Sequence, residues 1–163
     1  LCIDTPGHAR HHFCVWDARS QGWFTGDTFG LSYRELDSSN GPFVLPTTSP
    51  VQFEPAALKA SITRLLLYRP QSMYLTHYGP VSDVPRLAQS LYEQIDAMVA
   101  IADGCDGRAD RHRCIAAALS ALYLERAHAQ QVPLADEDVL RLLAMDVELN
   151  AQGLGVWLDR GRP

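Results

Sequence analysis

The order of hydrophobic patterns along the chain constrains its fold most. Short strand-like and helical segments alternate up to about residue 103, and every later segment has a helical pattern. The whole chain has 163 residues, without internal repeats or a low-complexity linker, which suits one domain of about 100–200 residues. We therefore expect an α/β (α+β) fold over residues 1–103, followed by a helical extension over residues 104–163.

The first part of the chain predicts a small sheet with one helix packed on it. Two short aromatic segments flank a polar stretch, which is typical of a β-hairpin. A long connection without a clear period follows, and connections of that kind are often functional. The predicted elements are a hairpin of residues 12–16 and 22–25, a connection over residues 28–53, a helix over residues 54–68, and a buried strand over residues 72–76 that Gly79 and Pro80 end.

The remaining segments predict three helices with apolar stripes at helical spacing. We expect the last two to be antiparallel to each other and to pack on the first. The predicted helices cover residues 85–102, capped by Asp83 and stopped by Gly104, then residues 109–129, and finally residues 135–151, closed by Gly153.

Charge and cysteine content limit the functional classes. The formal charge of −5 argues against a nucleic-acid-binding surface, and no apolar run approaches the ~18 residues of a membrane span. The four scattered cysteines do not resemble the dense framework of a small secreted protein, so we predict reduced thiols and a cytoplasmic location. Cys105, His112 and Cys114 match no common zinc spacing and predict ordinary packing.

Three polar residues stand at strand boundaries: His8, Asp27 and His77. In an antiparallel hairpin the start of the first strand lies beside the end of the second, so His8 and Asp27 share one edge of the sheet. His77 joins them if the strand over residues 72–76 ends at the same edge. Each residue alone is better explained as a hydrogen-bonded histidine or as turn chemistry. Together they predict a metal site, because Zn²⁺ takes nitrogen and oxygen ligands and iron and manganese accept similar sets.

The motifs around these residues resemble those of the metallo-β-lactamase-fold hydrolases. Thr-Pro-Gly-His ends at His8, Thr-Gly-Asp-Thr surrounds Asp27, and Leu-Thr-His-Tyr-Gly-Pro surrounds His77, in the family's order. The branch most similar is that of the glyoxalase II-like and general hydrolases. The resemblance implies an αββα sandwich, of which residues 1–103 would form the C-terminal half. The family's His-x-His-x-Asp-His motif is absent from these residues, and we expect it to precede them.

Site roles follow from the resemblance residue by residue. His8 would complete the first metal site, Asp27 would bridge two metals and orient the nucleophile as the catalytic residue, and His77 would belong to the second site. Zinc is the expected metal at both sites, with iron or manganese as alternatives. Three further residues could support the ligands or contact substrate: His12, His11 and Tyr33. The loop that holds Tyr33 could also merely cover the sheet.

The function implied for the intact protein is metal-dependent hydrolysis of a small-molecule substrate. A metal-activated water would attack an ester, thioester, amide or phosphodiester, and this fragment alone would be inactive. One alternative is an iron-dependent oxygenase or diiron redox protein of the same fold. Another is a non-catalytic helical assembly module. We also expect a homodimer through the C-terminal helices, and no nucleic-acid or membrane partner.

Overall fold

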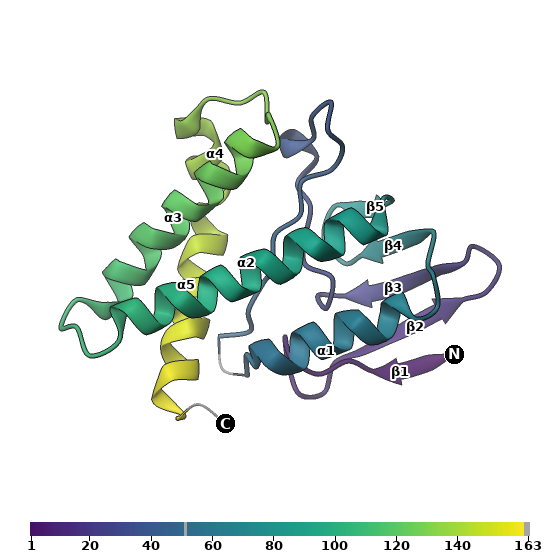
Figure 1. The fold of residues 1–163 in the computed structure, drawn as a ribbon, viewed down its shortest axis with the longest axis horizontal. Coiled ribbons are helices and arrows are strands. Elements are labelled where there is room, and N and C mark those ends of the chain that lie inside the picture. The colour runs from purple at the N-terminus through teal and green to yellow at the C-terminus, as the bar shows by residue number, and fades with distance from the viewer. Residues whose placement is uncertain (51, 162–163) are drawn as a thin grey trace.

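The computed structural model describes residues 1–50 and 52–161, which form one sheet with helices on one face and beside one end (Figure 1). Within these residues, no helix combines the length and apolar character needed to cross a bilayer. The elements are β1 (Cys2–Asp4), β2 (Phe13–Asp17), β3 (Gly22–Gly26), the 3₁₀ helix η1 (Arg34–Leu36), α1 (Pro55–Leu66), β4 (Ser72–Leu75), β5 (Gly79–Val81), α2 (Val84–Cys105), α3 (Arg111–Ala129), α4 (Asp136–Leu142) and α5 (Ala144–Asp159).

The sheet has the strand order β1-β2-β3-β4-β5, and it confirms the predicted hairpin and the strand that joins it. Neighbouring strands are antiparallel except β3 and β4, which run parallel. Because parallel strands end at the same edge of a sheet, the residues that follow β3 and β4 are brought together. Asp27 follows β3 and His77 follows β4.

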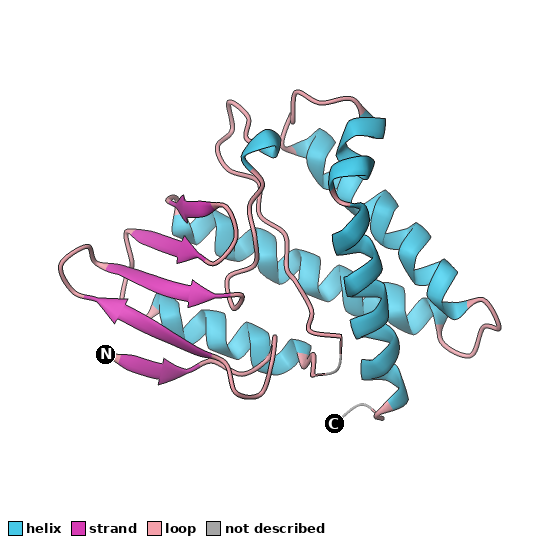
Figure 2. Ribbon diagram, turned by 180° about the vertical axis from the view of Figure 1, so that it is seen from behind, coloured by secondary structure: helices cyan, strands magenta, loops and turns pink. Residues whose placement is uncertain are grey.

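The two faces of the sheet differ in what covers them. Trp23 and Met73 pair in register and are fully buried, and Trp23 Nε1 donates a hydrogen bond to the Leu65 carbonyl of α1 at 3.1 Å. Both views place α1 and α2 on this face, and no helix among the described residues covers the other (Figure 2). The uncovered face carries exposed apolar side chains: Phe13 (55%), Val15 (39%) and Phe24 (52%).

The strand predicted over residues 72–76 ends before Gly79, as expected, because β4 stops at Leu75 and a turn follows. Gly79 and Pro80 then begin the edge strand β5, a position at which proline is tolerated. The capping prediction for the next helix is wrong. Asp83 stands at the N-terminus of α2 but its side chain makes no capping hydrogen bond. Its Oδ2 instead accepts a hydrogen bond from Arg86 Nε at 2.6 Å.

Between residues 104 and 161 the structure has three helices where two were predicted. The helix expected over residues 135–151 is divided at Leu143 into α4 and α5. The second piece continues past Gly153, which was predicted to close it, to Asp159. This position inside the helix requires glycine because the loop residue Thr48 packs directly on the helix backbone there. The predicted packing on α2 is confirmed, since both α3 and α5 contact that helix.

The cysteine prediction is wrong for two of the four residues. Cys105 at the end of α2 and Cys114 in α3 form a disulfide, while Cys2 and Cys14 are free. The short connection between the two helices brings the Cα atoms of Cys105 and Cys114 to 5.9 Å from each other, within the range that a disulfide can bridge. The cysteines therefore do not support the predicted cytoplasmic location.

Candidate functional site

His8 is held in a defined orientation by the loop that precedes β2. Gly7 has a φ of +134°, and a Cβ there would lie 2.2 Å from the backbone of Leu58, so only glycine fits. His8 Nδ1 lies 2.9 Å from the Thr47 carbonyl oxygen. Because a carbonyl can only accept, Nδ1 carries the proton. Burial lowers the pKa of His8, which favours the neutral ring, so Nε2 carries a lone pair.

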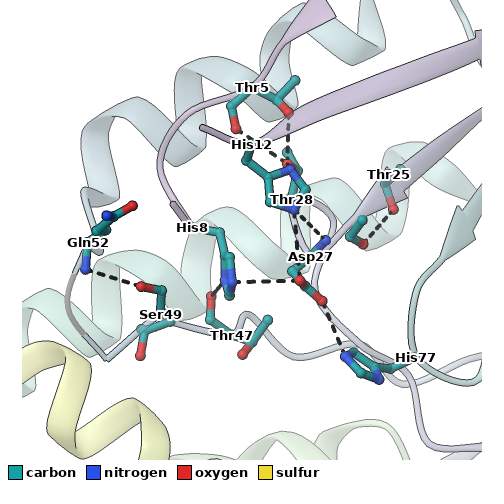
Figure 3. A network of polar contacts seen from close by, with 12 residues as sticks. Thr5, His8, His12, Thr25, Asp27, Thr28, Thr47, Ser49, Gln52 and His77 are labelled. Atoms are coloured by element: carbon teal, nitrogen blue, oxygen red, sulfur yellow. Dashed lines mark hydrogen bonds and ion pairs between the residues drawn. The ribbon is translucent and has the colours of Figure 1, made fainter. Parts of the chain in front are cut away.

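Asp27 lies at the centre of the cluster (Figure 3). Its Oδ2 is 3.6 Å from His8 Nε2, and its Oδ1 is 3.4 Å from His77 Nε2. The same Oδ2 lies 3.8 Å from His12 Nε2, which is too far for a hydrogen bond. The carboxylate therefore directs a different oxygen at each of two imidazoles that come from different parts of the sheet.

His77 lies in the three-residue turn between β4 and β5, where Leu75 pairs with Gly79. The next residue, Tyr78, has a φ of +74°, an uncommon conformation for a side chain of that size. The His77 side chain is 51% exposed, whereas that of His8 is 15% exposed. The structure thus brings together all three residues that the sequence predicted as ligands, and it leaves one of them open to solvent.

His12 supports Asp27 through both ring nitrogens. The Asp27 backbone N–H donates to His12 Nε2 at 3.1 Å, and Nδ1 lies 3.1 Å from Thr28 Oγ1. Hydrogen bonding with the Asp27 side chain would raise the pKa of His12 to about 9, but Oδ2 is 3.8 Å away. We assign a neutral ring, because the shorter contact with the N–H requires a lone pair on Nε2. Neither nitrogen is then available to a metal.

The other two candidates, His11 and Tyr33, have different surroundings. His11 is exposed and lines a pocket of about 600 Å³ beside His8. The Tyr33 hydroxyl donates to Asp146 Oδ2 of α5 at 2.9 Å, and its ring lies 4.3 Å from that of Tyr78. Tyr33 therefore packs against Tyr78, in the turn that holds His77.

Sequence reasoning missed the Thr47 carbonyl and Asp146. A backbone acceptor has no residue-type signature, and Asp146 lies in what the sequence presents as an ordinary helical pattern. Their partners are 39 and 113 residues away in the chain. No local pattern could have found either contact.

The donor atoms suit a zinc, iron or manganese ion in type. The lone pair of His8 Nε2 faces an anionic oxygen, and Asp27 Oδ1 is buried without a hydrogen-bond partner among the described residues. A cation between such groups would relieve their repulsion. However, residues 1–50 and 52–161 contain no group of three or more His, Cys, Asp or Glu that could hold a metal. These residues therefore fit part of a metal site without completing one.

Comparison with known proteins identifies the fold. No protein-family model matches the chain, and no curated protein matches it. Among solved structures, it is similar to an archaeal metallo-beta-lactamase superfamily protein from Sulfolobus tokodaii, with a TM-score of 0.53 and 24% identity over 94% of this chain. It is also similar to a metallo-beta-lactamase family protein from Thermus thermophilus, with a TM-score of 0.50 and 23% identity over 88% of this chain.

In both cases the match covers 44% of the solved chain, so this chain spans less than half the length of either structure. The predicted fold is confirmed: the chain has the fold of part of a metallo-β-lactamase domain. The similarity extends beyond the sheet to most of the helical region, since it covers 94% of the residues.

Proposed function

We propose that this chain is part of a metal-dependent hydrolase with the metallo-β-lactamase fold. One observation carries the proposal: the two oxygens of Asp27 face two separate imidazoles, His8 at 3.6 Å and His77 at 3.4 Å. A carboxylate in that position can bridge two metal ions, with one imidazole beside each. Neutral imidazole nitrogen and carboxylate oxygen are both zinc ligands, so zinc is the metal that we propose.

Bound zinc would lower the pKa of a water molecule toward neutrality and so supply a nucleophile for an ester, thioester, amide or phosphodiester. The residues of this chain would hold and orient that metal. Asp27 would offer one carboxylate oxygen beside each of the two imidazoles. The Thr47 carbonyl keeps the proton of His8 on Nδ1 and leaves Nε2 free to bind. His12 fixes the position of Asp27 through its backbone N–H.

Metal analysis and hydrolysis assays on the whole protein that contains this chain test the proposal. We expect zinc, turnover of at least one of those substrate classes, and loss of both in Asp27→Asn. The loss should exceed the roughly 10–100-fold effect of removing a residue that only supports a ligand. His128→Ala is the control, because His128 lies in an exposed ion pair with Asp136 on the helical extension. A protein that hydrolyses with unchanged rate after Asp27→Asn would contradict the proposal.

The same donor set also accepts iron, which keeps a redox enzyme as the second candidate. Stoichiometric iron with a redox-active spectrum, and no hydrolysis, would replace the hydrolase with an oxygenase or diiron protein. A whole protein that binds neither metal would indicate a non-catalytic assembly module.

The 163-residue chain by itself should bind zinc weakly. If Asp27 bridges, each site receives one imidazole and one carboxylate oxygen from this chain, whereas zinc sites use three or four protein ligands. We expect a Kd above about one micromolar and no hydrolase activity. Calorimetric titration of the purified chain with Zn²⁺ checks this. Stoichiometric, tighter binding that disappears in His8→Ala would contradict our ligand count.

A further inference from the structure

Helix α5 forms hydrogen bonds with the loop between β3 and α1 at Pro46 and Thr48, the two residues on either side of Thr47. Asn150 is 1% exposed, and its Oδ1 accepts a hydrogen bond from the Thr48 N–H at 2.8 Å. Its Nδ2 donates to the Pro46 carbonyl at 3.1 Å and to the Tyr123 hydroxyl at 2.7 Å. The amide of Asn150 thus bonds to the loop with both its donor and its acceptor.

Close packing at Gly153 reinforces this contact. A Cβ at Gly153 would lie 2.1 Å from Thr48 Oγ1 and 2.7 Å from Thr48 Cβ, so the loop lies against the helix backbone. Thr48 Oγ1 also donates to the Leu149 carbonyl at 3.2 Å. Residues 46–48 are therefore fixed on the turn of α5 that Asn150 and Gly153 form.

A single peptide group connects this turn to the candidate metal site. The Thr47 carbonyl and the Thr48 N–H belong to one planar trans peptide, so they point in opposite directions. Asn150 Oδ1 accepts from the Thr48 N–H on one side. The Thr47 carbonyl accepts from His8 Nδ1 on the other side (Figure 3). Rotating this peptide would break both hydrogen bonds at once.

We propose that Asn150 is a positioning residue for His8: by holding the peptide between Thr47 and Thr48, it keeps the His8 proton on Nδ1 and the Nε2 lone pair toward Asp27. The significance for metal binding rests on the function proposed above. The proposal gives the helical extension a role in shaping the site. A loop without this support could rotate its carbonyl away, and His8 could then take the other tautomer.

The tautomer of His8 in the metal-free 163-residue chain is the direct readout. Long-range ¹H–¹⁵N NMR of the imidazole at neutral pH distinguishes a protonated ring nitrogen from one with a lone pair. We expect a single Nδ1–H tautomer in the native chain. Asn150→Ala and Gly153→Ala should each produce a mixture, with the two ring-nitrogen shifts moving toward each other.

Each variant has a matched control. Gly155→Ala makes the same change two residues along α5, where the nearest atom to the new Cβ is Arg111 Nη2 at 3.9 Å. Gln94→Ala removes another fully buried amide that bonds the same loop, through the Val44 carbonyl at 2.8 Å. Both controls should keep the single Nδ1–H tautomer. If Asn150→Ala does not fold, as judged by its amide spectrum, Gly153→Ala carries the test because it removes no hydrogen-bonding group.

Three results would overturn the proposal: an Nε2–H tautomer in the native chain, an unchanged tautomer in folded Gly153→Ala, or an equal change in the controls. In the whole protein, Gly153→Ala should also weaken zinc binding by about 10–100-fold, the usual effect of losing a partner behind a ligand. The two proposals fail separately. Absence of zinc and hydrolysis would refute the function while the tautomer shift, measured without metal, would still stand.

Discussion

Asp146 is a buried carboxylate on α5, and its surroundings disfavour the charged form. Burial raises its pKa, and the hydrogen bond from Tyr33 only partly offsets that effect. A raised pKa in the folded state means that the folded chain binds more protons than the unfolded one. Stability from this group is therefore complete below the unfolded pKa near 3.8 and is lost as pH rises through the folded pKa.

We expect Asp146→Asn to stabilise the chain at pH 7, because asparagine keeps an acceptor for Tyr33 without the charge. The gain should shrink toward zero below about pH 3.8, where aspartic acid is also neutral. Urea unfolding of both proteins across this pH range measures the difference. Asp17→Asn is the control: hydrogen bonds from Ser20 lower the pKa of that carboxyl, so its replacement should not stabilise the chain at pH 7.

Gly26 precedes Asp27 and has no room for a side chain. Its φ is +51°, and a Cβ would lie 2.2 Å from His12 Cε1. We expect Gly26→Ala to destabilise the chain by about 1–3 kcal/mol through strain and displacement of His12. Gly107→Ala has the same kind of φ, +72°, with nothing within 4 Å, and should cost less. Equal losses of unfolding free energy in the two variants would mean that the His12 contact contributes nothing.

At the scale of elements, the connection between α2 and α3 depends on the Cys105–Cys114 disulfide. The two cysteines are nine residues apart, and closing a loop of that size removes about 2–3 kcal/mol of unfolded-state entropy in the chain-entropy model. We expect Cys114→Ser to lower the free energy of unfolding by about that amount. A reductant should have the same effect on the native chain and none on the variant, as thermal unfolding would report.

At the scale of the whole molecule, the uncovered sheet face predicts self-association of the isolated chain. Phe13, Val15 and Phe24 expose an apolar surface of a kind that marks interaction sites. Sedimentation velocity should show concentration-dependent association that Phe24→Thr reduces. Met145→Ser serves as the comparison, since Met145 is 71% exposed on α5.

This comparison also tests the predicted homodimer through the C-terminal helices. Three apolar side chains of α3 and α5 are fully buried within the chain: Ile115, Leu119 and Leu154. They therefore expose no surface that a second copy could contact. Association that Met145→Ser abolishes and Phe24→Thr leaves intact would place the contact on the helices instead of the sheet.

Local patterns in the sequence were enough to predict the hairpin, the strand that joins it, most helices and the three residues gathered at one edge of the sheet. These depend on local patterns: alternation of apolar residues sets a strand, and a residue next to a strand end inherits the position of that end. His8, Asp27 and His77 could be placed together for this reason, before any contact was known.

The surroundings of those three residues depend on how distant segments pack together. The Cys105–Cys114 disulfide, the division of the last helix at Leu143 and the tautomer of His8 all depend on groups that meet through packing. The bond from His8 reaches 39 residues to a backbone carbonyl, and the peptide that holds it is fixed by Asn150 another 102 residues along the chain. Hydrophobic periodicity indicates which face of an element is buried, but the packed fold decides which polar groups then face each other.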